Sequence, residues 1–497
     1  AAEVFPDISA LSVSQVEKKV IWAGSQDGLV HVTVDGGEHW SLVTPPQLKQ
    51  WATITSIEPS HFAAGTAYLT ASRYMWDDYH PYVFKTTDYG RHWVVMTHGL
   101  PDDQYVFTVK QDPNEASLLF LGTGNTVYVS LDGGTDWNPL AAKLPHVQVR
   151  DLAIDTREGE VVAATHGRSF WILGNLALLE QLAHQAQPAV DAVSLYAPQT
   201  AWLTHAYGQS AHAKYRQPVG TNAPFGATVF FHLPAKYDGK TPASLTFLDA
   251  QGKQIQHYTL HLKNKHAKKL PATVKDNLLP SQAKRIAEKK KTAVEPGVNR
   301  IQWNLRYADA TDVIGWEPPE DADGMVGKSR GPLVNPGHYT VVLRYGKQTY
   351  RQPFEVKLDP RLHTTPAILK QNLALELSLH NSIDVLDKDI NAAILLRQRL
   401  VKAVAAHTID ASAAAPAIKD LHDAIHAVAQ LDVRSSEGDV LHNMRLRSFL
   451  AYLQSSIGLD YQGPNPAQIA AFHELQGAAQ KGEARLRAAT AAGERLL

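Results

Sequence analysis

The chain has 497 residues, of which 44% are hydrophobic and 20% are charged, and its formal net charge is −1. These values are typical of a globular protein with two to four domains, and they exclude bulk electrostatic attraction to nucleic acid or anionic lipid. The sequence has no cysteine, which excludes disulfide bonds, thiolate catalysis and cysteine zinc sites. No apolar run approaches the length of a membrane span.

One short motif occurs three times in the first third of the chain. Its copies begin at Thr33, Thr86 and Ser130 and share the pattern Ser/Thr-x-Asp-x-Gly-x-x-Trp. The Asp can accept hydrogen bonds from its own tight turn, the Gly tolerates a positive φ, and the Trp can bury a large apolar face. The pattern is typical of the Asp box of β-propellers, so we expect structural aspartates and buried tryptophans. The residues concerned are Asp35, Gly37, Trp40, Asp88, Gly90, Trp93, Asp132, Gly134 and Trp137.

The motifs lie in predicted units of four strands that recur about every 40 to 50 residues, a period typical of propeller blades. The first strands of the units are expected at 8–13, 54–58, 106–110 and 149–154, and the second strands at 20–24, 66–70, 118–122 and 160–165. The fourth unit has residues 165–173, a strand that turns back, in place of the motif. Residues 1–180 are thus predicted to form about four propeller blades.

A propeller must close its ring, because an open ring leaves sheet edges unpaired. Asp-box propellers usually have six or more blades, so we expect residues 1–180 to be part of a larger ring. The other blades would come from an N-terminal propeller half, either an upstream segment or a separate chain. A self-contained ring of four blades is the alternative.

A second region follows a short predicted helix at 176–190. Alternating apolar runs predict strands at 227–233, 243–249, 297–305, 337–343 and 348–356, with Trp303 facing inward. This pattern predicts a β-sandwich of fibronectin or immunoglobulin type over 190–360. A basic insertion near 263–293 interrupts it; its lysine clusters could hold phosphate or lipid-like anions, but a solvated face is the favoured interpretation.

The last region, residues 364–497, is predicted to be helical. Thr365 and Pro366 form a suitable helix start, and apolar residues then recur at helical spacing. Further helices are expected at 414–431, 437–457 and from about 467 onward. Short connections predict an antiparallel hairpin or bundle.

Runs at 21–33, 81–90 and 164–173 resemble those of large bacterial Asp-box (BNR-repeat) proteins, which are often labelled glycosyl hydrolase or sortilin N-terminal domain proteins. The resemblance extends through residues 336–339 and 359–361 into the terminal helices, and it fits the C-terminal half of that architecture. It implies further blades upstream. The hydrolase label is shared with sialidases and xyloglucanases, so the resemblance implies a fold more firmly than a reaction.

The best functional candidate is a predicted long loop at 72–81, which mixes aromatic, charged and imidazole side chains. Two neighbouring carboxylates can divide into acid and base roles, although glycosidase carboxylates usually face each other across a cleft. The possible catalytic residues are Asp77, Asp78 and a partner such as Asp103 or Asp27. The possible ligand-binding residues are Arg73, Tyr74, Trp76, Tyr79 and His80. A loop that packs on the neighbouring domain is the plainer interpretation.

His166 and Arg168 flank a glycine and could contact an anion, but a structural turn at the end of the propeller is favoured. No arginine triad of the sialidase kind is present. The 23 histidines are scattered without a His-Glu-x-x-His motif, and residues 321–324 contain only a fragment of a calcium loop. P-loop, Rossmann and Gly-x-Ser-x-Gly motifs are absent. We therefore predict no metal site and no cofactor.

The sequence as a whole favours an exported propeller scaffold, periplasmic, cell-surface or secreted, that binds a glycan or polypeptide through its blade loops. A glycoside hydrolase with paired carboxylates is one alternative. A subunit of a cell-surface assembly, with the helices as the contact, is another. Neither nucleic acid nor a membrane span is expected.

Overall fold

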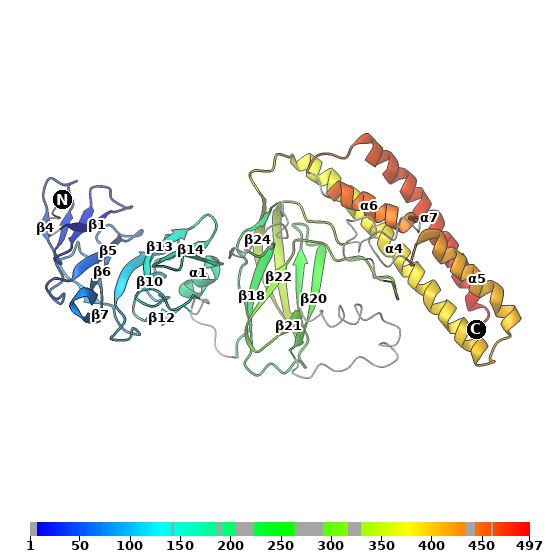
Figure 1. Ribbon diagram of the computed structural model, residues 1–497, viewed down its shortest axis with the longest axis horizontal. Helices are drawn as coiled ribbons and strands as arrows, with labels where there is room; N and C mark the ends of the chain where they lie inside the picture. Colours follow the sequence, from blue (N-terminus) through cyan, green and yellow to red (C-terminus); the bar gives the residue numbers. More distant parts are fainter. Residues whose placement is uncertain are drawn as a thin grey trace. The chain divides into compact units, whose positions relative to one another are not determined.

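The computed structural model describes residues 7–140, 144–185, 191–204, 223–263, 292–316, 330–432, 443–458 and 461–497. The chain divides into two units, Ala1–Ala189 and Val190–Leu497. It is mainly β-structure up to Leu358 and helical from Pro366 onward (Figure 1). Among the described residues, no helix combines the length and apolar character that a membrane crossing requires. Residues 321–324 and most of the basic insertion lie outside the described residues.

The first unit contains four consecutive antiparallel sheets in which each strand pairs with its neighbour in sequence. The first sheet has β1 (Ile8–Val13), β2 (Ile21–Ser25), β3 (Val30–Thr33) and β4 (Ser41–Leu42). The second has β5 (Thr53–Pro59), β6 (Ala67–Arg73), β7 (Asp78–Thr86) and β8 (Val94–Val95). The third has β9 (Val106–Gln111), β10 (Leu119–Thr123), β11 (Val127–Ser130) and β12 (Asn138–Pro139). The fourth has three strands, β13 (Val149–Asp155), β14 (Glu160–Thr165) and β15 (Phe170–Gly174).

Successive sheets pack face to face because neighbouring apolar side chains along each strand point to opposite faces of the sheet. In the second sheet, Leu69 and Phe84 belong to the core shared with the first sheet, whereas Tyr68 and Val83 belong to the core shared with the third. A separate core, which includes Phe120 of β10, joins the third sheet to the fourth. Each inner sheet therefore buries both of its faces.

The three repeated motifs form hairpins with the same hydrogen bonds. The Thr or Ser hydroxyl accepts from the backbone N–H of the motif glycine, at 3.0 Å for Gly37, 2.9 Å for Gly90 and 2.8 Å for Gly134. The same hydroxyl donates to the motif aspartate, which in turn accepts from the backbone N–H four residues later. All three glycines have positive φ, the conformation that glycine adopts at least cost.

The motif tryptophans differ in burial. Trp93 and Trp137 are 7% and 2% exposed, and their indole N–H groups donate to the carbonyl oxygens of Val43 (2.7 Å) and Met96 (2.9 Å) in the preceding sheet. Trp40 is 44% exposed, so the expectation that it is buried is wrong. The reason is that Trp40 lies in the first sheet, which has no preceding sheet among the described residues.

Helix α1 (Leu176–His184) follows β15 and ends six residues before the predicted limit of 190. Its first residue, Leu176, is buried in the core that joins the third and fourth sheets. The helix therefore belongs to the first unit, where Glu180 and Ala183 accept hydrogen bonds from Asn114 and Ser117 in the turn between β9 and β10.

The second unit begins with two sheets that share one core. The three-stranded sheet has the order β16 (Ser194–Leu195), β18 (Ala227–Leu233), β22 (Gly297–Trp303). The six-stranded sheet has the order β17 (Ala201–Leu203), β24 (Gln348–Leu358), β23 (Gly337–Tyr345), β19 (Ala243–Leu248), β20 (Gln254–Leu262), β21 (Ala293–Val294). Trp303 is fully buried and stacks on Phe247 of the opposite sheet at 4.4 Å between ring centroids. The long strand β20 was not among the predicted strands, and the fibronectin or immunoglobulin type stays a prediction.

The helices of the second unit are α4 (Pro366–Ala405), α5 (Ala411–Val428), α6 (Leu446–Gly458) and α7 (Pro466–Glu494). Thr365 caps α4, and Asn465 with Gln468 forms a capping box at the start of α7. The long helix α4 contacts each of the other three (Figure 1). The third helix begins at Leu446 rather than at 437, because residues 443–445 are not helical; residues 433–442 lie outside the described part.

A buried ion pair joins α4 to α6. Arg447 donates to both carboxylate oxygens of Asp387, at 2.6 and 2.8 Å, and its guanidinium lies over the ring of Trp316 at 4.7 Å. Asp384 and Asn391 of α4 also accept hydrogen bonds from the backbone N–H groups of Thr311 and Ile314, in the segment that follows β22. The sheets and helices thus meet inside one unit, and the predicted domain boundaries at 190–360 and 364–497 stay a prediction.

Candidate functional site

A hollow of about 740 Å³ opens beside the second sheet of the first unit. It is lined by residues from the connection between the first and second sheets, from β7 and its preceding turn, from β8, and from the connection to the third sheet. The lining residues are Gln47, Lys49, Asp77, Asp78, Tyr79, His80, Pro81, Tyr82, Phe84, Val95 and Asp102. Four of the residues singled out from the sequence, Asp77, Asp78, Tyr79 and His80, lie in this wall.

The segment that positions these side chains is a tight hairpin rather than the predicted long loop. Strand β6 continues to Arg73, which pairs with Asp78 at the start of β7. Between them lie one turn of 3-10 helix, Tyr74–Trp76, and Asp77 with a φ of 55°. Strands β6 and β7 extend further than expected because their backbone pairing continues through polar residues. The alternation of apolar and polar residues in the sequence does not predict strand there.

Asp78 is the electrostatic centre of the hollow. Its carboxylate accepts hydrogen bonds from Lys49 Nζ (3.0 Å), Arg73 Nη1 (3.0 Å) and the Tyr82 hydroxyl (2.9 Å). Burial opposes its ionisation, but the hydrogen bonds from Lys49 and Tyr82 outweigh burial and lower the pKa of Asp78 below its usual value. The bond to Asp78 likewise raises the pKa of Lys49. Asp78 is therefore a fixed carboxylate and is poorly suited to act as a general acid.

The other predicted carboxylates are placed differently. Asp77 lines the hollow beside Asp78. Asp103 is exposed and is not part of the lining, whereas its neighbour Asp102 is, with an oxygen 3.8 Å from His80 Nδ1. Asp27 lies in the turn between β2 and β3, where it accepts from the hydroxyl of Ser25. The structure therefore brings together Asp77, Asp78 and Asp102, and not the pair with Asp103.

An aromatic cluster holds the other side of the hairpin. Tyr74 stacks on Tyr105 at 5.3 Å, and Tyr79 meets the same ring edge-on at 5.6 Å. Phe107 completes the cluster, with the guanidinium of Arg150 4.0 Å from its centroid. These contacts tie the hairpin of the second sheet to β9 and β13, so the wall of the hollow is braced by three sheets.

Several apolar side chains near the hollow face solvent. Met75 is 80% exposed, Trp76 is 60% exposed and Tyr79 is 44% exposed. Trp76 lies outside the lining, whereas Tyr79 is part of it. Exposed aromatic rings beside a polar hollow offer faces on which a sugar ring or an apolar peptide side chain can stack.

His166 and Arg168 lie elsewhere, in the exposed turn between β14 and β15. The backbone N–H of His166 donates to Gln148, and the carbonyl of Arg168 accepts from the indole of Trp171. Neither residue lines the hollow, so their anion-binding role stays a prediction.

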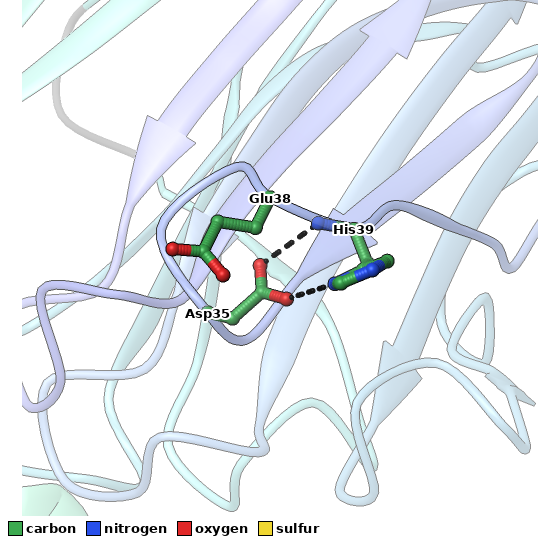
Figure 2. Close-up of side chains that lie close together, drawn as sticks. All are labelled: Asp35, Glu38 and His39. Carbon is green, nitrogen blue, oxygen red and sulfur yellow. Dashed lines mark hydrogen bonds and ion pairs between the residues drawn. The ribbon is translucent and has the colours of Figure 1, made fainter.

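One group of side chains has the spacing of a metal site. Asp35, Glu38 and His39 bring ligand atoms within 4.8 Å of one another in the first motif hairpin (Figure 2). Both oxygens of Asp35 already accept hydrogen bonds, from the backbone N–H and from the ring of His39. The bonds from the Thr33 hydroxyl and His39 hold the pKa of Asp35 well below its usual range. Because Asp88 and His92 repeat the arrangement without a counterpart of Glu38, the group is explained by the hairpin itself.

Sequence reasoning missed several residues of the site, chiefly Lys49, Tyr82 and Tyr105. Lys49 reaches Asp78 from a connection 29 residues earlier in the chain, and no local pattern marks that contact. Tyr82 occupies the same strand as Asp78, four places later, so alternation along β7 was a usable signal. The sequence gives only an indirect sign of Tyr105, which is the glycine at position 124. Gly124 packs against the ring of Tyr105, and a Cβ atom at this position would lie 2.4 Å from a ring atom.

No protein-family model matches the sequence, and no match is found among curated proteins. Solved structures with similarity include YCF48 from Cyanidioschyzon merolae, at 14% identity over 46% of this chain and 67% of that chain, with a TM-score of 0.24. The GH74 enzyme of Niastella koreensis matches at 13% identity over 51% of this chain and 37% of that one, with a TM-score of 0.28. The GH74 xyloglucanase from Xanthomonas campestris matches at 15% identity over 47% and 41%, with a TM-score of 0.30. At these scores the similarities identify neither a family nor an activity.

Proposed function

We propose that the first unit is part of an Asp-box β-propeller and that its hollow binds a glycan or an extended polypeptide. Four consecutive meander sheets with shared cores support the propeller assignment. The two-sheet region would be a sandwich of fibronectin or immunoglobulin type. The resemblance to exported Asp-box proteins favours a periplasmic, cell-surface or secreted location.

One observation carries the binding proposal: a fixed, ionised Asp78 in the wall of a hollow, beside the exposed ring of Tyr79. A carboxylate held by three side-chain donors and by the backbone N–H of His80 keeps one orientation, so it can accept further hydrogen bonds from sugar hydroxyls or peptide N–H groups without reorganising. The ring of Tyr79 supplies an apolar face next to it. Ligand pockets typically combine apolar surface with a few fixed polar groups in this way.

Hydrolysis is the weaker interpretation of the same hollow. A glycosidase requires one carboxyl group that can hold a proton for the leaving group. Asp78 is unsuited to that role because its hydrogen bonds from Lys49 and Tyr82 favour the ionised form. The proposal therefore assigns Asp78 to ligand orientation rather than to proton transfer.

The test is calorimetric titration of the full chain against a panel of soluble polysaccharides and unstructured peptides, with reducing-end and peptide-release assays on the same mixtures. Binding without turnover is expected. Tyr79→Ala and Asp78→Asn should each weaken the affinity at least about tenfold, equivalent to about 1.4 kcal/mol.

Phe62→Ala is the matched control, because Phe62 is an aromatic residue, 46% exposed, in the connection between β5 and β6 of the same sheet, and it does not line the hollow. It should leave the affinity unchanged. Equal binding by all three variants would place the ligand elsewhere, and catalytic turnover abolished by Asp77→Asn would favour the hydrolase.

A further inference from the structure

The first strands of the four sheets can be compared position by position. Each has a bulge after an apolar residue, and a second apolar residue follows three places after the first. In the last three sheets both residues are at most 2% exposed and belong to the core shared with the preceding sheet. These residues are Ile54 and Ile57, Val106 and Val109, and Val149 and Leu152.

In the first sheet the same two positions are uncovered. Ile8 is 68% exposed and Leu11 is 65% exposed. Leu11 stands opposite Ala23, which stands opposite His31, which stands opposite Leu42, so these residues share one face of the sheet. The opposite face, which includes Trp22, is buried against the second sheet. The first sheet therefore leaves bare, that is exposed to solvent, the face that each of the other three sheets buries against the preceding sheet.

Trp40 independently indicates that the first sheet lacks a preceding sheet among the described residues. Trp93 and Trp137 each donate an indole hydrogen bond to a carbonyl oxygen of the preceding sheet, that of Val43 or Met96. Val43 and Met96 both lie three places after the motif tryptophan of their own sheet, just beyond its short fourth strand. The indole of Trp40, in the first copy of the motif, has no acceptor among the described residues.

The fourth sheet is also bare on its outer side. Phe170 and Ile172, 72% and 63% exposed, stand opposite Ala164 and Val162 on the face turned away from the third sheet. This sheet has three strands in the described part of the chain, since α1 begins directly after β15. Within the described residues it therefore has no fourth strand and no carbonyl equivalent to those of Val43 and Met96, so it lacks the acceptor that Trp40 requires.

We propose that the two bare faces are the contact surfaces for a polypeptide that supplies further four-stranded blades, different in sequence from residues 7–174. One of these blades packs on Ile8 and Leu11 and offers Trp40 a main-chain carbonyl from the end of its own fourth strand. Another part of the same polypeptide covers Phe170 and Ile172. A second copy of this chain does not meet the requirement, because its fourth sheet lacks that carbonyl and its first sheet has the same bare face. The inference rests on the proposed assignment of the first unit to a propeller, and it is independent of what occupies the hollow beside the second sheet.

The proposal is tested by placing the photoreactive residue p-benzoylphenylalanine at position 11 of the full chain, expressed in the organism that makes it, and sequencing the cross-linked peptides by mass spectrometry. Val16 provides the control position, because it is an apolar residue, 49% exposed, that lies in the turn between β1 and β2 and not on the bare face. We expect an adduct from position 11 and none from position 16. The cross-linked peptide should come from a repeat that contains the Ser/Thr-x-Asp-x-Gly-x-x-Trp motif and is absent from residues 7–174.

Three outcomes would overturn the proposal: no adduct at position 11, an adduct with a protein that has no such repeat, or an adduct with residues 7–174 of a second copy. Sedimentation of the purified chain checks the last point separately. The chain and its Leu11→Ser variant should both sediment as monomers over a wide concentration range. A dimer that Leu11→Ser dissociates would assign the face to self-association.

Discussion

The repeated hairpins of the first unit and the contact between α4 and α6 in the second unit satisfy their buried polar groups in opposite ways. In the sheets, a neutral hydroxyl such as that of Thr86 bonds to groups two and four residues away in the same hairpin. In the helices, the ion pair of Asp387 and Arg447 joins residues 60 positions apart. The difference teaches that local polar contacts leave a readable motif in the sequence, whereas long-range ionic contacts depend on the packed fold and leave none.

The largest expected effect is in the helices. Asp387→Ala leaves the guanidinium of Arg447 buried without its carboxylate, and breaking a buried pair in this way costs about 3–5 kcal/mol. Urea unfolding of the full chain, followed by the helical circular dichroism signal, should show this loss in the free energy of unfolding.

The matched control is Asp420→Ala, which breaks the pair of Asp420 with Arg485, also long-range but nearly half exposed. Because water solvates both charges, its cost should stay within about 1 kcal/mol. Equal losses for the two variants would show that burial does not set the strength of the ionic contacts.

A smaller and pH-dependent effect is expected at Glu376 of α4. Burial raises the pKa of Glu376 to about 7, from 4.5, against the opposing effect of Arg306. Between these two pH values the folded state holds a proton that the unfolded state has lost, so the free energy of unfolding falls as the pH rises. The loss between pH 4.5 and pH 8 should amount to about 2–3 kcal/mol.

Glu376→Gln should remove this loss, because glutamine does not ionise, and unfolding curves at acidic and mildly alkaline pH would measure it. Glu474→Gln, at an exposed position on α7, should leave the pH dependence as it is. A Glu376→Gln protein with an unchanged pH profile would contradict the raised pKa.

The smallest effect belongs to the hairpins. Thr86→Val keeps the shape of the side chain but leaves the N–H of the buried Gly90 without its acceptor, at a cost of about 1–2 kcal/mol. The loss should not vary between pH 5 and 8, because the hydroxyl does not titrate there.

Thr33→Val tests the same bond in the first hairpin, where Gly37 is partly exposed and water can replace the hydroxyl. We expect a smaller loss than for Thr86→Val in thermal unfolding. A larger one would mean that the hairpins are not stabilised by these bonds in proportion to their burial.

Much of the fold was predictable, because the strands and helices follow local periodicity. The strand at 227–233 and the cap at Thr365 agree with the structure residue for residue. Strand β20 was missed because its apolar residues are interrupted by exposed polar ones, as at His257 and Thr259. The burial of Trp40 was wrongly predicted because a motif describes a hairpin and says nothing of whether a neighbouring sheet is present.

Less of the candidate site was predictable. The cluster at 73–80 was found from composition alone, and it supplies four of the lining residues of the hollow. The partners that fix Asp78 were not found together, since Lys49 comes from another connection and Tyr82 from within a strand. Charge pairing across sheets is a property of how the sheets pack, and a single sequence carries no local sign of it.

The indole contacts between sheets have a consequence for how such a chain can grow. The acceptor is a main-chain oxygen, and the residues that provide it, Val43 and Met96, have unrelated side chains. Every amino acid offers the same oxygen, so the contact places no demand on the neighbour's identity at that point. A duplicated unit would need no compensating substitution there, and gene duplication could lengthen the array one unit at a time while the units drift apart in sequence.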